Sequence, residues 1–145
     1  MTLWTVATLM TGLLAAGPGD MATVVQAPDS PVRLDKATIL RVPDAPAVLL
    51  YSATNTTEQT LDQFTVMVFV FDAQGRLKAR HVAPGRRTLE PRESKYSAMV
   101  LDGAPVDTAD VLVVGVNQAQ RVNSDAWWRA ELQPAAEEAA KRKKP

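Results

Sequence analysis

The stretch FTVMVFVF at residues 64–71 restricts the possible folds more than any other part of this sequence. Every residue in it except Thr65 is apolar, and the side chains of a strand alternate between two faces. One face would carry Phe64, Val66, Val68 and Val70, and the other Thr65, Met67, Phe69 and Phe71. A strand with two apolar faces needs cover on both. The second face has three possible sources of cover, namely a long loop, a terminal segment or another molecule, so Met67, Phe69 and Phe71 are candidate partner-binding residues.

Short runs rich in β-forming residues fill most of the chain, and Pro, Asp, Asn and Gly separate them. The expected strands lie at 23–27, 33–42, 47–55, 64–71, 76–82, 88–101, 110–120 and 126–132. This spacing predicts an all-β domain, either an antiparallel sandwich or a barrel. The core should be concentrated in Val66, Val68, Val70, Leu112, Val114 and Val116.

The segment DAQG at 72–75 follows the central strand directly. Asp at the first position and Gly at the fourth suit a type I turn closed by a left-handed glycine, which predicts a tight hairpin. In the strand that follows, alternation predicts that its basic residues share one face. We therefore consider a candidate anion-binding set that consists of Arg76, Lys78, Arg80, Arg86 and Arg87.

Two stretches, ATNTTEQTLDQFTVMVFVFDAQGRL and RTLEPRESKYSAMV, resemble the FxLYD-type immunoglobulin-like domains of bacterial exported proteins. Residues 68–72 (VFVFD) stand where the family has Phe-x-Leu-Tyr-Asp, and only Asp72 is identical. In LEPRE at 89–93, Arg92 replaces the usual glycine. The resemblance covers residues 47–117 and implies an immunoglobulin-like antiparallel β-sandwich of about seven strands, together with export. It implies no catalytic residues.

Composition sets the class of the protein. A chain of 145 residues forms one domain of ordinary size, here expected at 20–133. Basic and acidic residues balance at 16 each, so the net charge favours no specific nucleic-acid partner. The absence of cysteine excludes disulfides and thiolate metal sites.

Both ends of the chain differ from the domain between them. Residues 1–19 form an apolar leader without a charged side chain, which has three readings: a cleaved signal peptide, an uncleaved membrane anchor or a structural segment of the fold. We expect a periplasmic or secreted protein, with membrane contact only through this segment if it is uncleaved. The charged tail at 134–145 has no large apolar face, so we expect it to be solvated and either disordered or helical.

Groups suited to catalysis or metal binding are sparse. The single histidine, His81, is expected to be a half-buried structural residue. Asp107 and Asp110 supply too few carboxylates for a calcium site, and we expect a solvated loop there. The triplet at 55–57 (NTT) matches a glycosylation acceptor, a pattern that is frequent by chance. We therefore expect no enzyme, no metal and no cofactor.

Two functions remain open. The first is a non-catalytic exported binding or structural module that contacts another envelope or secreted protein, with the adjacent Trp127 and Trp128 as further candidate anchors unless the last strand simply closes the core. The second is a binder of an anionic polymer or lipid surface through the hairpin at 76–95. Seven basic residues there against Glu90 and Glu93 leave an excess of five positive charges, although a solvated hairpin would show the same composition.

Overall fold

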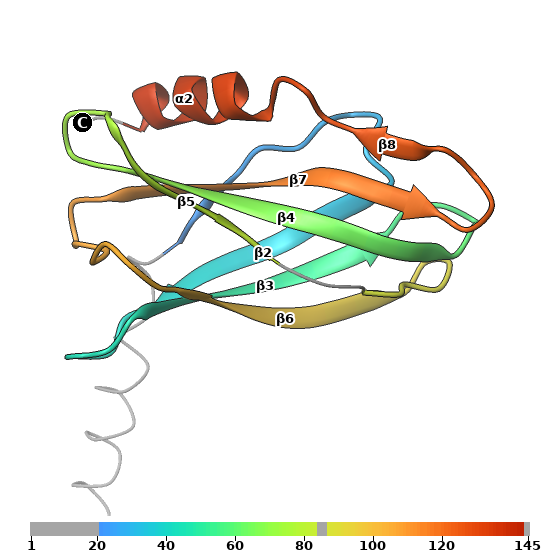
Figure 1. The fold of residues 1–145 in the computed structure, drawn as a ribbon, viewed down its shortest axis with the longest axis horizontal. Coiled ribbons are helices and arrows are strands. Elements are labelled where there is room, and N and C mark those ends of the chain that lie inside the picture. The colour runs from blue at the N-terminus through green and yellow to red at the C-terminus, as the bar shows by residue number, and fades with distance from the viewer. Residues whose placement is uncertain (1–20, 84–86, 144–145) are drawn as a thin grey trace, which may run out of the picture.

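The computed structural model describes residues 21–83 and 87–143, and its strands form two sheets that face each other (Figure 1). The three-strand sheet has the order β2-β3-β6, with β2 at Val32–Leu40, β3 at Ala47–Asn55 and β6 at Ser94–Leu101. The five-strand sheet has the order β1-β7-β4-β5, with β8 also paired to β7. Its strands are β1 at Thr23–Val24, β4 at Leu61–Phe71, β5 at Leu77–Val82, β7 at Val111–Arg121 and β8 at Ala126–Trp128. The expected all-β, two-sheet architecture is confirmed.

Strand β4 lies inside the five-strand sheet, antiparallel to both β5 and β7. Val68 pairs with His81 on one side and with Val114 on the other. The short strand β1 joins the far edge of β7 in parallel, and β8 pairs antiparallel with a later part of β7. The central strand therefore has neighbours at both edges, so its long apolar run forms part of a continuous sheet.

The main core lies between the two sheets. Val66, Val68 and Val70 of β4 are buried there, together with Leu112, Val114 and Val116 of β7, as the sequence predicts. Residues 47, 49, 51 and 53 of β3 close the core from the opposite sheet. Alternation thus assigns the inner face of β4 correctly.

The turn after β4 also has the predicted geometry. The Gly75 N–H donates to the Asp72 carbonyl over 2.9 Å, and Gly75 has a φ of 84°. The Asp72 carboxylate accepts hydrogen bonds from the N–H groups of Gln74 and Arg76, both 2.9 Å long. The bond from the Arg76 N–H is the main cause that lowers the pKa of Asp72.

Asn55 connects the end of β3 to two loops. Its buried side-chain Nδ2 donates to the carbonyls of Gln59, Leu89 and Glu90, and its Oδ1 accepts from the Thr57 N–H. These bonds give the Asn55 amide a structural role at the end of β3. The turn at 90–93 keeps its hydrogen bond from Glu93 N to Glu90 O because Arg92 adopts the left-handed conformation at φ 65°, so the missing glycine does not prevent it.

The C-terminal residues form helix α2 (Leu132–Arg142), which packs on the outer face of the five-strand sheet (Figure 1). The helical alternative for the tail is therefore the one observed, but the expectation that the tail is solvated is wrong for the buried face of this helix. One face of the helix, made by Leu132, Ala136 and Ala140, is buried against Phe69, Phe71 and Val113. Because the sheet contributes the large side chains of this contact, small alanine side chains on the helix are sufficient to bury it. The expected leader at 1–19 lies outside the described residues.

Gly115 of β7 makes room for the helix. A Cβ atom at this position would lie 2.6 Å from Cδ1 of Leu132, closer than carbon atoms in contact approach, and 3.1 Å from Cγ2 of Val25, which is a tight contact. Leu132 therefore sits directly over a glycine. The run at 126–132, expected as a strand, is divided between β8 and the start of this helix.

Candidate interaction surface

We call the outer face of the five-strand sheet the covered face. Phe69 and Phe71 are each only 1% exposed there, and Met67 is half-buried beside them. These three candidate partner-binding residues are brought together as predicted, but helix α2 occupies the surface that they form. Of the three possible sources of cover, the terminal segment is the one observed.

The two adjacent tryptophans have different environments. Trp127 packs against the main core, and its Nε1 donates to Oδ2 of Asp29 over 3.0 Å. Trp128 is 65% exposed. Trp127 thus closes the core, and Trp128 alone remains available at the surface.

The basic hairpin is interrupted by a register shift in β5. Val70 pairs with Ala79 while Phe71 pairs with Leu77, which leaves Lys78 as the extra residue of a β-bulge. The Lys78 ammonium instead lies 2.6 Å from Oδ2 of Asp110 and 3.2 Å from Oδ2 of Asp107. The hydrogen bond to Asp110 is the main cause that raises the pKa of Lys78.

The other members of the basic set point to different parts of the molecule. Arg80 donates to Oε1 of Gln133 on α2 over 3.1 Å, whereas Arg87 donates to Oγ of Ser97 on β6. Arg76 is exposed at the hairpin turn, and Arg86 lies outside the described residues. Arg76, Lys78, Arg80 and Arg87 therefore do not form one surface, because the bulge and the contacts across the sheets divide them.

The remaining polar candidates have structural partners. Asp110 and Asp107 hold Lys78, and the Asp107 N–H donates to Oδ2 of Asp110 over 2.7 Å, so this loop is an ion-paired loop rather than a freely solvated one. His81 is half-buried, as expected, and burial lowers its pKa while Asp102 acts in the opposite direction. Among the described residues, no group of three or more His, Cys, Asp or Glu side chains could hold a metal ion.

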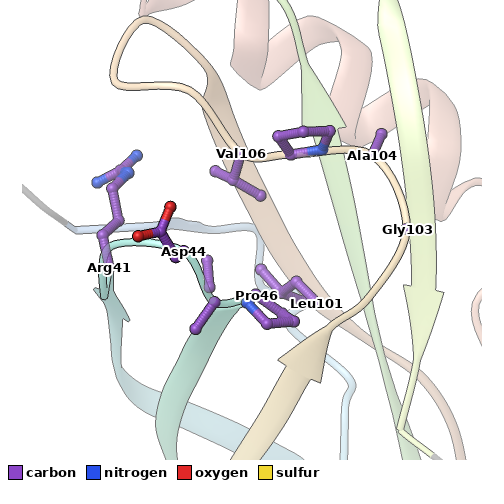
Figure 2. A pocket seen from close by; sticks show the side chains of 10 residues that line it. Arg41, Asp44, Pro46, Leu101, Gly103, Ala104 and Val106 are labelled. Carbon is purple, nitrogen blue, oxygen red and sulfur yellow. The ribbon is translucent and has the colours of Figure 1, made fainter.

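A pocket of about 420 Å³ lies at one end of the sandwich, between the turn after β2 and the loop after β6 (Figure 2). Arg41 and Asp44 line it from the turn, and Leu101, Ala104 and Val106 line it from the strand end and loop. Arg41 Nη2 donates to the Asp107 carbonyl over 3.3 Å, which ties the two loops together. The lining contains no nucleophile beside a base, so we assign it no chemistry.

We call the outer face of the three-strand sheet the open face. The register of β2, β3 and β6 sets its side chains in three rows across the sheet. These rows are Leu40–Val48–Val100, Thr38–Leu50–Ala98 and Lys36–Ser52–Tyr96. Leu40, Leu50 and Val100 are each more than a third exposed, and Tyr96 is 81% exposed. An apolar patch of this kind often marks an interaction site.

A shallow groove of about 540 Å³ runs across the open face. Lys36, Leu50, Ser52, Tyr96 and Ala98 are among the residues that line it. Beyond it, Thr54 donates to Oδ2 of Asp35 over 2.5 Å, and Oγ of Ser94 lies 2.6 Å from Oγ1 of Thr54. The open face therefore has an apolar end at residues 40, 48 and 100 and a polar end at residues 35, 54 and 94.

The open face is not predicted from the sequence, although a signal for it is present. The run at 47–55 (AVLLYSATN) is apolar on both faces near its start, as the central strand is, and alternation sets Val48 and Leu50 outward. The same reasoning applied to β6 sets Tyr96, Ala98 and Val100 outward. Only the pairing of the strands shows that these positions meet in one patch.

Comparisons with protein-family models, with curated proteins and with solved structures find no match to this chain. Within residues 21–83 and 87–143, no helix has the length and apolar character needed to cross a membrane.

Proposed function

We propose that this protein is a non-catalytic, exported interaction module of the bacterial cell envelope, and that it binds protein through the open face. The observation that carries the proposal is the contrast between the two outer faces. Helix α2 buries the apolar side chains of one, while Leu40, Leu50, Tyr96 and Val100 remain exposed on the other. Removing such side chains from water favours association by roughly 1.5–3 kcal/mol for each one fully buried.

We further propose that the sandwich is of the immunoglobulin-like type. The order β2-β3-β6 would correspond to strands A, B and E, and the order β8-β7-β4-β5 to strands G, F, C and C′. The hydrogen-bonded Asn55 side chain and the turn at 72–75 lie in the segments that resemble the FxLYD-type domains, which supports the same assignment. Loops and faces of such sandwiches commonly bind other proteins.

Export is the part of the proposal that rests on the sequence of residues 1–19. If this segment is a cleaved signal, protein recovered from the native host has an intact mass that excludes Met1 and the apolar run up to Ala16. A recovered mass that includes them would contradict the cleaved-signal proposal.

Binding through the open face can be tested with a matched pair of variants. Leu50→Glu places a charge on the open face, and Val122→Glu places the same charge at a similarly exposed apolar residue in the loop after β7. Each purified protein is cross-linked to envelope fractions of the native host. We expect the Val122→Glu protein to give the cross-linked products of the wild type and the Leu50→Glu protein to lose them. Equal products from both variants would place the binding site elsewhere.

A further inference from the structure

We propose that the open face binds the open face of a second copy of this chain, with the strands of the two copies antiparallel. This inference rests on the proposed function and names the partner. A pair related by a two-fold axis uses the same patch on both copies, so the patch must be complementary to itself. Two features meet this requirement, namely the apolar centre of the open face and the opposite net charges beyond the two ends of its strands.

The apolar centre is the row that contains Leu50. If a two-fold axis lies in the interface across the strands at this row, Leu50 faces its own copy. The row of Leu40, Val48 and Val100 then lies over the row of Lys36, Ser52 and Tyr96 in the other copy. Tyr96 of each copy, an exposed ring with one polar end, covers the exposed Val100 of the other.

Charge favours the antiparallel arrangement over the parallel one. Lys36 lies on the row of Tyr96, and it has no ion pair among the residues that the structure describes. Asp44 and Asp102 are exposed at the other end of the sheet, also without an ion pair in the described part of the chain. Arg41 lines the same pocket as Asp44, so two acidic residues against one basic residue leave an excess of one negative charge at this end. The antiparallel pair sets Lys36 of one copy near the acidic end of the other, whereas the parallel pair sets like ends together. Complementary charges of this kind fix the register of an interface.

The size of the open face predicts how tight the pair is. Three strands spaced about 4.8 Å apart, each with about eight residues at about 3.3 Å per residue, present a flat area of roughly 400 Å². Stable interfaces bury about 800 Å² on each partner. The pair is therefore a reversible dimer that depends on protein concentration.

Sedimentation velocity over a concentration series tests the proposal on the full chain and on two variants. We expect reversible monomer–dimer association for the wild type and for Val122→Glu, and association at least about tenfold weaker for Leu50→Glu. Because both substituted residues are exposed, both variants should keep the melting midpoint of the wild type. A wild type that stays monomeric throughout, or equal association constants for all three proteins, would overturn the proposal.

A second pair of variants tests the antiparallel arrangement. Lys36→Glu brings like charges together at both ends of the interface and should weaken dimerisation. Adding Asp44→Asn removes that repulsion and should restore part of the affinity, and asparagine tolerates the φ of 62° at this position. If the double variant dimerises no better than Lys36→Glu alone, the antiparallel arrangement is wrong.

Sedimentation and cross-linking together distinguish a failure of the second-copy inference from a failure of the proposed function on which it rests. If every variant is monomeric but Leu50→Glu loses its cross-linked envelope products, the second-copy inference fails and the proposed function stands. If every variant is monomeric and the products are unchanged, both fail. If the dilute monomer already shields Tyr96 from a surface-labelling reagent and loses that shielding when residues 1–20 are deleted, the occupant is that segment, which overturns the inference.

Discussion

The two outer faces of the sandwich carry similar side chains but have different surroundings. On the covered face, Phe69 and Phe71 of β4 lie under helix α2, which is the last element of the chain and about 60 residues away in sequence. On the open face, Leu50 and Tyr96 have no such cover among the described residues. An apolar outer face is therefore ambiguous in the sequence, because its cover can come from any segment with a small, well-matched surface. Among the described residues, the two faces differ in that helix α2 covers one of them and leaves the other exposed.

Of the changes considered, removal of α2 should reduce the stability of the protein most, because it uncovers the covered face. A chain stopped after Ala130 would expose Phe69, Phe71 and Val113, each worth roughly 1.5–3 kcal/mol of burial. We expect a loss of more than about 3 kcal/mol in the free energy of unfolding, measured by denaturant melts, and new binding of a hydrophobic dye. A chain stopped after Lys143 is the control and should match the full chain. An unchanged melt for the shorter chain would mean that α2 does not protect this face.

Single aromatic truncations should distinguish the two faces next. Phe69→Ala removes a ring that is 1% exposed and should cost about 3–5 kcal/mol of stability. Tyr96→Ala removes an exposed ring and should change stability by less than about 0.5 kcal/mol. Similar costs for the two variants, measured by the same melts, would remove the distinction between the faces.

A smaller effect should follow from filling the space at Gly115. Gly115→Ala drives a methyl group toward Leu132 and Val25, and overpacking of this kind typically costs about 1–3 kcal/mol. Leu132→Ala removes the closest atom, so the double variant should lose less stability than the two single losses added together. Simple additivity in a double-mutant cycle would show that Leu132 does not sit over this glycine.

The smallest effect concerns a lysine on each sheet. Lys78→Met removes a partly exposed ion pair with Asp110 and should lower the free energy of unfolding by up to about 1 kcal/mol. Lys36→Met on the open face should leave the free energy of unfolding almost unchanged. Because the folded pKa of Lys78 is raised, its stabilising effect is complete below the unfolded pKa of 10.5. That effect is lost as the pH rises through the folded pKa. Alkaline melts of Lys78→Met should therefore fall less steeply with pH than those of the wild type, and identical slopes would count against the ion pair.

Local patterns in the sequence were sufficient to predict the inner face of β4, the hairpin turn at 72–75 and most strands. Each of these depends on neighbouring residues, through alternation or turn chemistry. A helix is one of the two alternatives that the sequence offers for the tail, but its packing on the sheet is not predicted, because Leu132, Ala136 and Ala140 form only a small apolar stripe. Its burial depends on large side chains from β4 and β7, and on Gly115, all distant in sequence.

In the candidate site, too, local sequence patterns do not predict contacts between residues that are distant in sequence. Alternation placed Lys78 with Arg76 and Arg80, but a bulge in β5 turned it toward Asp110, and no local pattern marks that bulge. Met67, Phe69 and Phe71 were correctly placed on one face, yet the sequence could not decide what covers them. The open face needed the pairing of β2, β3 and β6 before its rows could be seen.

Hydroxyl-radical footprinting of the dilute full chain tests the central claim most directly, because one experiment reads both faces. Phe and Tyr rings are modified according to their exposure, so we expect strong oxidation at Tyr96 and little at Phe69 and Phe71. Comparable oxidation of Phe69 and Tyr96 would contradict the account, since it would show that α2 leaves the covered face as accessible as the open one.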